Sequence, residues 1–175
     1  AVISQRGEGN IILDKDLIDN WSLRIAAGED LGKILDSEEK PITDLDVDID
    51  SGAIFEIDGD DLDDGEFSKD ITGRGGVKIN GDVSFTQDDT GNDPDITFEG
   101  PTEINGGRLS LDVPNAIDDS SGVELINGGD LSASAGQTLK SISGSNTNSN
   151  LNINNDSNVT INDISGGTLA ASLNV

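Results

Sequence analysis

The sequence Ile104-Asn105-Gly106-Gly107-Arg108-Leu109-Ser110 recurs in this chain of 175 residues. It returns as Ile126-Asn127-Gly128-Gly129-Asp130-Leu131-Ser132, in looser form as Ile164-Ser165-Gly166-Gly167-Thr168-Leu169-Ala170, and more faintly as Ile79-Asn80-Gly81-Asp82-Val83-Ser84. The copies start 25, 22 and 38 residues apart (104−79, 126−104, 164−126), and Ile142 divides the last interval into 16 and 22. A unit of about 20 residues that ends one short strand, turns on glycine and starts another is typical of a stacked β-solenoid, because a single coil cannot bury its own apolar face.

Apolar and polar residues alternate from Asp44 onward, which indicates strands with one buried face. Leu45, Val47 and Ile49 alternate with aspartates, and glycine, asparagine and aspartate separate this run from the later ones. Apolar stripes at helical spacing are absent. The sequence therefore predicts an all-β chain, in which residues 44–175 form solenoid repeats and residues 1–43, with no clear period, form an atypical N-terminal cap or arm. The Ser- and Asn-rich tract 141–158 is predicted to form strands with hydrogen-bonded polar stacks between coils, with a flexible linker as the alternative.

A second β architecture fits the same residues. Asn105-Gly106 and Asn127-Gly128 lie between alternating runs, and an Asn-Gly step in that position is also the strongest short signal for an antiparallel hairpin. Repeated hairpins would build an antiparallel β-sandwich. The regular spacing favours the solenoid, and the sandwich remains the alternative.

Three segments resemble the passenger repeat of bacterial autotransporters: Ile71-Thr72-Gly73-Arg74-Gly75-Gly76-Val77-Lys78-Ile79, then Thr97 to Leu111, then Pro114-Asn115-Ala116-Ile117. That repeat opens on leucine-threonine-glycine-x-glycine-glycine and closes on glycine-x-threonine-x-isoleucine-x-x-glycine-x-leucine. The resemblance covers residues 71–117, and in part residues 122–135 and 161–173. It implies a right-handed parallel β-helix displayed outside a Gram-negative-type cell, often as an adhesin or a self-associating surface protein.

The chain is strongly acidic. It has 35 acids and 10 bases, a net charge of −25, of which residues 1–100 contribute −19 (8−27) and residues 101–175 contribute −6 (2−8). This charge repels phosphate backbones and anionic lipids, so nucleic acid and membrane surfaces are excluded as partners. No apolar run approaches the ~18 residues of a membrane span, so no membrane insertion is expected. Cationic partners are favoured, calcium above all.

The candidate calcium ligands lie between Asp44 and Glu66, where 11 of 23 residues are acids and none is a base. Carboxylates two apart on a strand share one face at about 6.6 Å, a spacing that suits a shared Ca²⁺. The turn Asp58 to Glu66 is the best single loop candidate, although Leu62 occupies the place of an oxygen ligand of an EF-hand. The alternative is a solvated acidic face. The predicted metal ligands are Asp46, Asp48, Asp50, Asp58, Asp60, Asp61, Asp63, Asp64 and Glu66; Asp88 to Asp95 and Asp118-Asp119 are weaker acidic turns.

Catalysis has few residues to use. His and Cys are absent, which removes the commonest general base and the best nucleophile at neutral pH. A carbohydrate-active β-helix enzyme with Arg74, Lys78 or Arg108 as base or charge stabiliser is the chemical alternative. Sugar clefts are usually lined by aromatic side chains, and this chain has one Trp, four Phe and no Tyr. We therefore expect no enzyme.

The function that we expect is a non-enzymatic extracellular structural or adhesive surface protein that self-associates, stabilised by calcium. Its partners would be further copies, in a homo-oligomer or filament, and cell-surface or matrix ligands. The alternative within this class is a pilus-like filament subunit, in which Ala1 to Ile25 donates a strand to its neighbour. Ala1 is not a translation start, which suggests a removed secretory signal and a secreted or cell-surface location.

Overall fold

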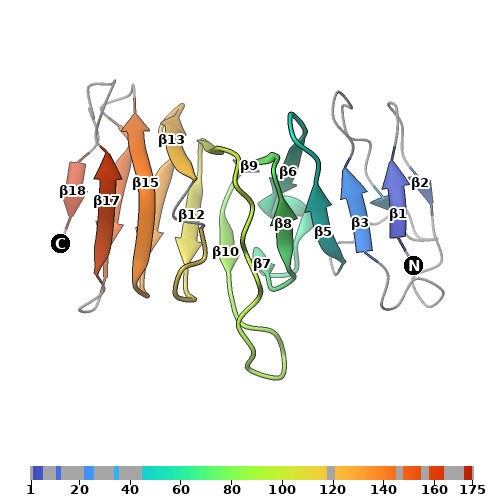
Figure 1. The fold of residues 1–175 in the computed structure, drawn as a ribbon. Coiled ribbons are helices and arrows are strands. Elements are labelled where there is room, and N and C mark those ends of the chain that lie inside the picture. Colours follow the sequence, from blue (N-terminus) through green and yellow to red (C-terminus); the bar gives the residue numbers. More distant parts are fainter. Residues whose placement is uncertain are drawn as a thin grey trace.

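The computed structural model describes residues 2–5, 11–12, 22–25, 34–35, 45–117, 121–144, 148–154, 158–163 and 172–174. In this part of the chain the strands form a right-handed parallel β-helix (Figure 1). Every strand pair among the described residues is parallel. The solenoid prediction is therefore confirmed and the antiparallel sandwich is wrong, because Asn-Gly here turns the chain into the next sheet of a coil and not back along its own sheet.

Three long sheets run along the solenoid. Sheet 1 contains β1 Val2–Gln5, β3 Ser22–Ile25, β5 Asp46–Ile49 and β8 Ile71–Gly73. Sheet 2 contains β6 Ile54–Asp58, β9 Gly76–Asn80, β11 Thr102–Asn105, β13 Gly122–Ile126, β15 Gln137–Gly144 and β17 Val159–Asp163. Sheet 3 contains β7 Glu66–Phe67, β10 Val83–Phe85, β12 Arg108–Leu111, β14 Asp130–Ala133, β16 Asn150–Ile153 and β18 Ser172–Asn174. A pair of short strands, β2 Ile11–Ile12 and β4 Ile34–Leu35, forms a separate sheet, and the 3-10 helix η2 spans Gly59–Asp61.

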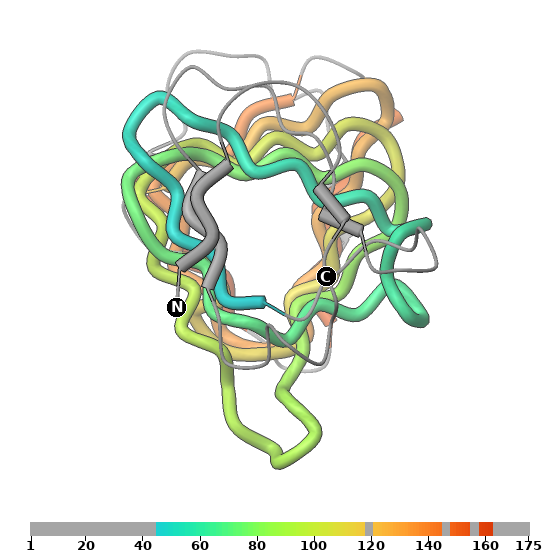
Figure 2. The backbone as a smooth tube through the Cα atoms, turned by 90° about the vertical axis from the view of Figure 1, so that its right-hand side faces the viewer, coloured from blue at the N-terminus to red at the C-terminus, as the bar shows by residue number. Residues whose placement is uncertain are grey.

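Successive coils stack directly on one another. The pairings Val77↔Thr102, Leu109↔Leu131 and Leu131↔Leu151 separate partners by 25, 22 and 20 residues (102−77, 131−109, 151−131). Figure 2 looks along the axis from the N-terminal end, and the coloured part of the chain turns clockwise as it recedes, which is the right-handed sense.

The core is a column of aligned apolar side chains inside the coils. Ile79, Ile104 and Leu125 occupy one row of sheet 2, and each of them is buried. On sheet 3, the rings of Phe67 and Phe85 pack against one another at a tilt of 58°, with centroids 6.1 Å apart. Burial of such rows is the main favourable term for the fold.

Glycine is required where coils meet at the corner between sheets 2 and 3. Gly106 and Gly107 have φ of 68° and 67°, and a Cβ on Gly107 would lie 2.2 Å from the carbonyl oxygen of Gly81 in the preceding coil. Only glycine meets both demands, a positive φ and a backbone contact this close. The recurrent Asn-Gly-Gly step is therefore a corner of the solenoid.

One detail of the repeat is shifted. The sequence copies align Ile104 with Ile126, whereas the structure places Ile104 opposite Leu125 and Asn105 opposite Ile126. Ile126 is consequently half-exposed and Leu125 is buried. The extra residue is absorbed at the next corner, where Asn127 and Gly128 have positive φ, so Leu109 and Leu131 are again aligned at the spacing of the copies.

The described N-terminal strands follow the same parallel order. β3 pairs with β1 on one side and with β5 on the other, so β1 and β3 extend sheet 1 beyond β5. Parallel stacking therefore continues before Asp44. Most of residues 1–43 lie outside the described residues, so the cap or arm stays a prediction.

Candidate functional site

Sheet 3 carries an outward polar face on strands β10 to β16. We use the name polar face for Ser84, Arg108, Ser110, Asp130, Ser132, Asn150 and Asn152. Ser84, Ser110, Ser132 and Asn152 are aligned in one row by the strand register, and Arg108, Asp130 and Asn150 form a second row. The alternate residues Leu109, Leu131 and Leu151 are buried in the core.

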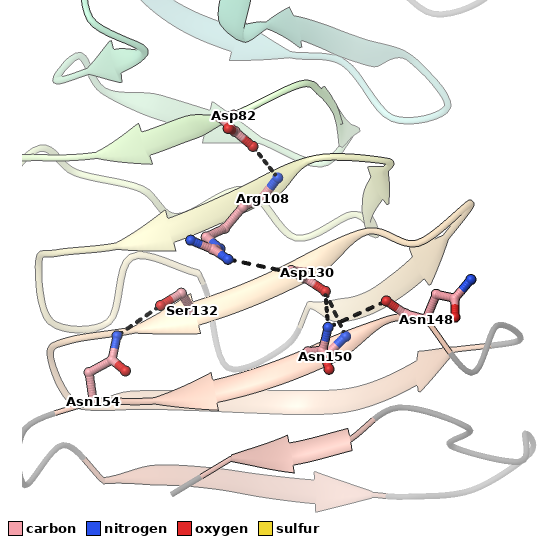
Figure 3. A network of polar contacts seen from close by, with 7 residues as sticks. All are labelled: Asp82, Arg108, Asp130, Ser132, Asn148, Asn150 and Asn154. Carbon is pink, nitrogen blue, oxygen red and sulfur yellow. Dashed lines mark hydrogen bonds and ion pairs between the residues drawn. The ribbon is translucent and has the colours of Figure 1, made fainter.

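The second row is held by contacts between coils, as Figure 3 shows. The backbone N–H of Arg108 donates to Asp82 Oδ1 at 2.9 Å, and an Arg108 guanidinium nitrogen lies 3.8 Å from Asp130 Oδ2. The other oxygen of Asp130 accepts from the backbone N–H and from Nδ2 of Asn150, at 2.7 and 2.9 Å. The Asp130 carboxylate therefore joins three successive coils.

Ser132 and its neighbours extend these contacts. Asn154 Nδ2 donates to Ser132 Oγ at 3.0 Å (Figure 3), and Ser134 Oγ donates to the Asp112 carboxylate at the border of the face. The expectation that polar residues of tract 141–158 hydrogen-bond between coils is confirmed for Asn150 and Asn154, two of its members.

The polar face carries less net charge than the outward residues of the other sheets, although the exposed Glu66 of β7 lies in line with Ser84 at its N-terminal edge. Within its strands Arg108 balances Asp130, so its seven residues sum to zero (1−1). The outward residues of β6 to β15 on sheet 2 include four acids, Glu56, Asp58, Glu103 and Glu124, against Lys78 and Lys140. On sheet 1, β5 alone exposes Asp46 and Asp48.

Sheet 2 carries a ladder of amides at its border. Asn127 Nδ2 donates to Asn105 Oδ1 at 2.6 Å, Asn105 Nδ2 donates to Asn80 Oδ1 at 3.1 Å, and Asn80 Nδ2 donates to the Glu56 carboxylate. All donors point toward the N-terminal end and the last acceptor is an anion, an arrangement in which successive hydrogen bonds polarise one another favourably. Three copies of the Asn-Gly motif thus supply a structural ladder along the axis.

The predicted metal ligands are divided between two places. Asp46 and Asp48 are exposed on β5, with Val47 and Ile49 buried between them, as the alternation predicted. Asp50 follows at the turn, half-buried. Asp44 lies outside the described residues.

The remaining predicted ligands lie after β6. Asp58 is the N-cap of η2 and accepts the backbone N–H of Asp60 at 3.1 Å. Asp60, Asp63, Asp64 and Glu66 are exposed, and Asp61 is half-buried. In residues 45–117 and the later described segments, no group of three or more acidic side chains is arranged to hold a metal ion. Calcium binding by these residues stays a prediction.

The loop Thr86–Asp95 projects from the solenoid between β10 and β11 (Figures 1 and 2). Asp88 organises it: one carboxylate oxygen accepts the backbone N–H groups of Asn92 and Thr90, at 2.8 and 2.9 Å, and the Thr90 hydroxyl at 2.7 Å. The hydrogen bonds from the Asn92 backbone and from the Thr90 side chain lower the pKa of Asp88 to about 2. This loop is the predicted second acidic turn; Asp118 and Asp119 of the third lie outside the described residues.

The basic residues weighed for catalysis do not share a face. Lys78 lies on sheet 2, 3.9 Å from Glu103, whereas Arg108 lies on sheet 3 beside Asp130. Arg74 lies at the corner after β8, where its backbone N–H donates to the Ile49 carbonyl. These three side chains therefore do not line a common cleft.

Comparison with known proteins gave no match to a family model, a curated protein or a solved structure. Among the described residues, no helix has the length and apolarity needed to cross a membrane.

Proposed function

We propose that this chain is a non-enzymatic structural segment of an extracellular surface protein, an acidic shaft that self-associates when divalent cations reduce its repulsion. The observation that carries the proposal is the continuous apolar column of the solenoid, which aligned strands surround from β5 to β16. Stacked coils of this kind form quasi-one-dimensional bodies, in which each coil contacts its neighbours along the axis. Such an elongated body can act as a spacer and can present the same surface several times along its length.

The outward carboxylates support the part assigned to calcium. Asp46 and Asp48 are exposed on one strand, about 6.6 Å apart by strand geometry, and no base faces outward from the described side chains of β5 and β8. Ca²⁺ prefers carboxylate and carbonyl oxygens and accepts six to eight of them. We propose that Ca²⁺ bridges carboxylates of neighbouring molecules, which together complete its coordination.

Strand donation by Ala1 to Ile25 fits the structure less well than the shaft. β1 and β3 already pair with one another and with β5 in the same chain. Donation would first require these strands to leave sheet 1. The shaft needs no such rearrangement.

The test is the size of the protein in solution, measured by sedimentation velocity at constant ionic strength. We expect the sedimentation coefficient to rise when CaCl₂ is added and to rise less in NaCl alone at the same ionic strength. Addition of EDTA should return it to the monomer value. A monomer under all these conditions would refute self-association.

Charge-removing variants locate the calcium effect. Asp46→Asn with Asp48→Asn removes two carboxylates from one strand, and Glu99→Gln with Glu124→Gln removes the same charge from separate exposed positions. Bridging at β5 predicts that only the first pair raises the Ca²⁺ concentration needed for half-maximal association. Equal shifts in both pairs would indicate general screening of charge.

A further inference from the structure

We infer that copies of this chain associate side by side through the polar face of sheet 3, so that a second copy is the partner of this surface. This inference rests on the proposed self-association and names the surface that carries it.

The first reason is electrostatic. Each molecule carries a net charge of −25, so two copies repel one another in most orientations. The seven residues of the polar face sum to zero, whereas β5 exposes two aspartates and the outward side of sheet 2 has an excess of acids. The exposed acids Glu66, Asp82 and Asp112 adjoin the face, so a contact centred on β12 and β14 is the one that keeps them at its border. Such a contact brings fewer like charges together than a contact through β5 or sheet 2, and like charges across an interface cost several kcal/mol.

The second reason is the presence of both signs of charge in one row. Arg108 has a side chain that is 54% exposed, and its neighbour Asp130 is 18% exposed. A two-fold contact places the same patch on both partners, so that Arg108 of one copy can approach Asp130 of the other. Because the 3.8 Å contact within one chain is long and the Arg108 side chain is half-exposed, little is lost when Arg108 exchanges partners.

The third reason is shape. Ser84 and Ser110 have short, half-exposed side chains, and the register places them in line with Asn152. Ser132 lies in the same row but is buried and accepts a hydrogen bond from Asn154. Rows of short polar side chains on parallel in-register strands can interdigitate closely with an identical row. The acids at the border, Asp82 and Asp112, already accept hydrogen bonds from neighbouring coils.

The size of the face sets the expected strength. Four strands at about 4.8 Å and about four residues at 3.3 Å give a patch of roughly 14 by 13 Å. This is well below the ~800 Å² that each partner buries in a stable complex. We therefore expect a weak, reversible contact that becomes effective when it is repeated along aligned shafts.

Cysteine crosslinking tests a contact of this strength, and the chain contains no native cysteine. Ser110→Cys places a thiol at the centre of the polar face. Ser143→Cys is the matched control, since Ser143 is also a half-exposed serine within a strand but follows Glu124 in the row of sheet 2. Both variants are oxidised in the 175-residue chain, in NaCl with and without CaCl₂. Disulfide-linked dimers are measured over time, and labelling by a monofunctional maleimide corrects for thiol reactivity.

We expect Ser110→Cys to form dimers about tenfold faster than Ser143→Cys, a ratio that corresponds to ~1.4 kcal/mol. A second variant, Ser84→Cys with Ser110→Glu, should lose this crosslinking because it adds a carboxylate to the face, whereas Ser84→Cys alone should keep it. Equal rates for Ser110→Cys and Ser143→Cys, or no dimer from either, would overturn the inference. Growth in Ca²⁺ with no preference for Ser110→Cys would refute this surface alone, whereas a monomer in every condition would refute the proposed function as well.

Discussion

Replacement of Thr102 by valine should stabilise this protein. Thr102 is fully buried in β11, between Val77 and Val123 of the neighbouring coils, and its hydroxyl oxygen has no hydrogen-bond partner. A buried hydroxyl without a partner costs about 1–3 kcal/mol, and an added apolar carbon contributes about 0.8 kcal/mol. Allowing for imperfect packing of the new methyl group, we expect Thr102→Val to raise the free energy of unfolding by about 1–2 kcal/mol, or Tm by about 2–8 °C.

Ser121→Ala is the control. Ser121 is equally buried, but its hydroxyl donates to the Gly100 carbonyl at 2.5 Å. Its loss leaves that carbonyl unpaired and should lower the free energy of unfolding by about 1 kcal/mol. Urea unfolding followed by far-UV circular dichroism measures both variants against the parent chain. A destabilised Thr102→Val, or two variants that change in the same direction, would show that the hydrogen bonding of the core is not as described.

Three further predictions concern a loop, a corner and the amide ladder. The pKa of Asp88, measured by NMR titration, should lie near 2, below its ordinary value of 3.8, and Thr90→Val should raise it. Because the pKa is lower in the folded state, the contribution of Asp88 to stability is complete above pH ~4 and is lost as the pH falls through ~2. An unshifted pKa would contradict the hydrogen bonds of the loop. Gly107→Ala should lower the free energy of unfolding by several kcal/mol in urea titrations, since its Cβ would lie 2.2 Å from the Gly81 oxygen, and Gly91→Ala, with open space around it, is the control for positive φ alone. Asn105→Asp should cost about 1 kcal/mol at pH 7, because the donor to Asn80 is replaced by an acceptor; a neutral effect would remove the ladder from the stabilising contacts.

The periodic features of the sequence predicted the fold well. The alternation around Val47 and Ile49 predicted β5 and its two faces, and the Gly-rich repeat predicted the corners. These features were accessible because alternation and glycine conformation are local properties, which the chain expresses whatever its partners. The choice between parallel and antiparallel pairing was not local, since Asn-Gly serves both.

The register between strands of successive coils could not be predicted from the sequence repeats alone. The copies of the motif align Ile126 with Ile104, but pairing within sheet 2 and pairing within sheet 3 follow different spacings, so Leu125 takes the buried position. The difference is absorbed at the corner where Asn127 and Gly128 have positive φ. A repeat unit read as one rigid block misses this shift.

The candidate surfaces were predicted unequally. Clustering of acids in sequence marked Asp46 and Asp48 at once, because neighbours in a strand are neighbours in space. The polar face was missed, since Ser84, Ser110 and Ser132 lie 26 and 22 residues apart (110−84, 132−110) and only the stacked register aligns them. The available signal was the serine at the same place in three copies of the repeat, which could have been followed from copy to copy.

One distance tests the stacking of coils most directly. Glu66 and Asn152 are 86 residues apart in sequence (152−66), and the pairings Glu66↔Ser84, Ser84↔Ser110, Ser110↔Ser132 and Ser132↔Asn152 place four strand spacings between them. Spin labels on Glu66→Cys and Asn152→Cys, in a chain without native cysteine, should give one narrow distribution by pulsed electron paramagnetic resonance, centred on a backbone separation of about 19 Å. A broad distribution, or a separation far from this value, would contradict a single solenoid of parallel coils in register.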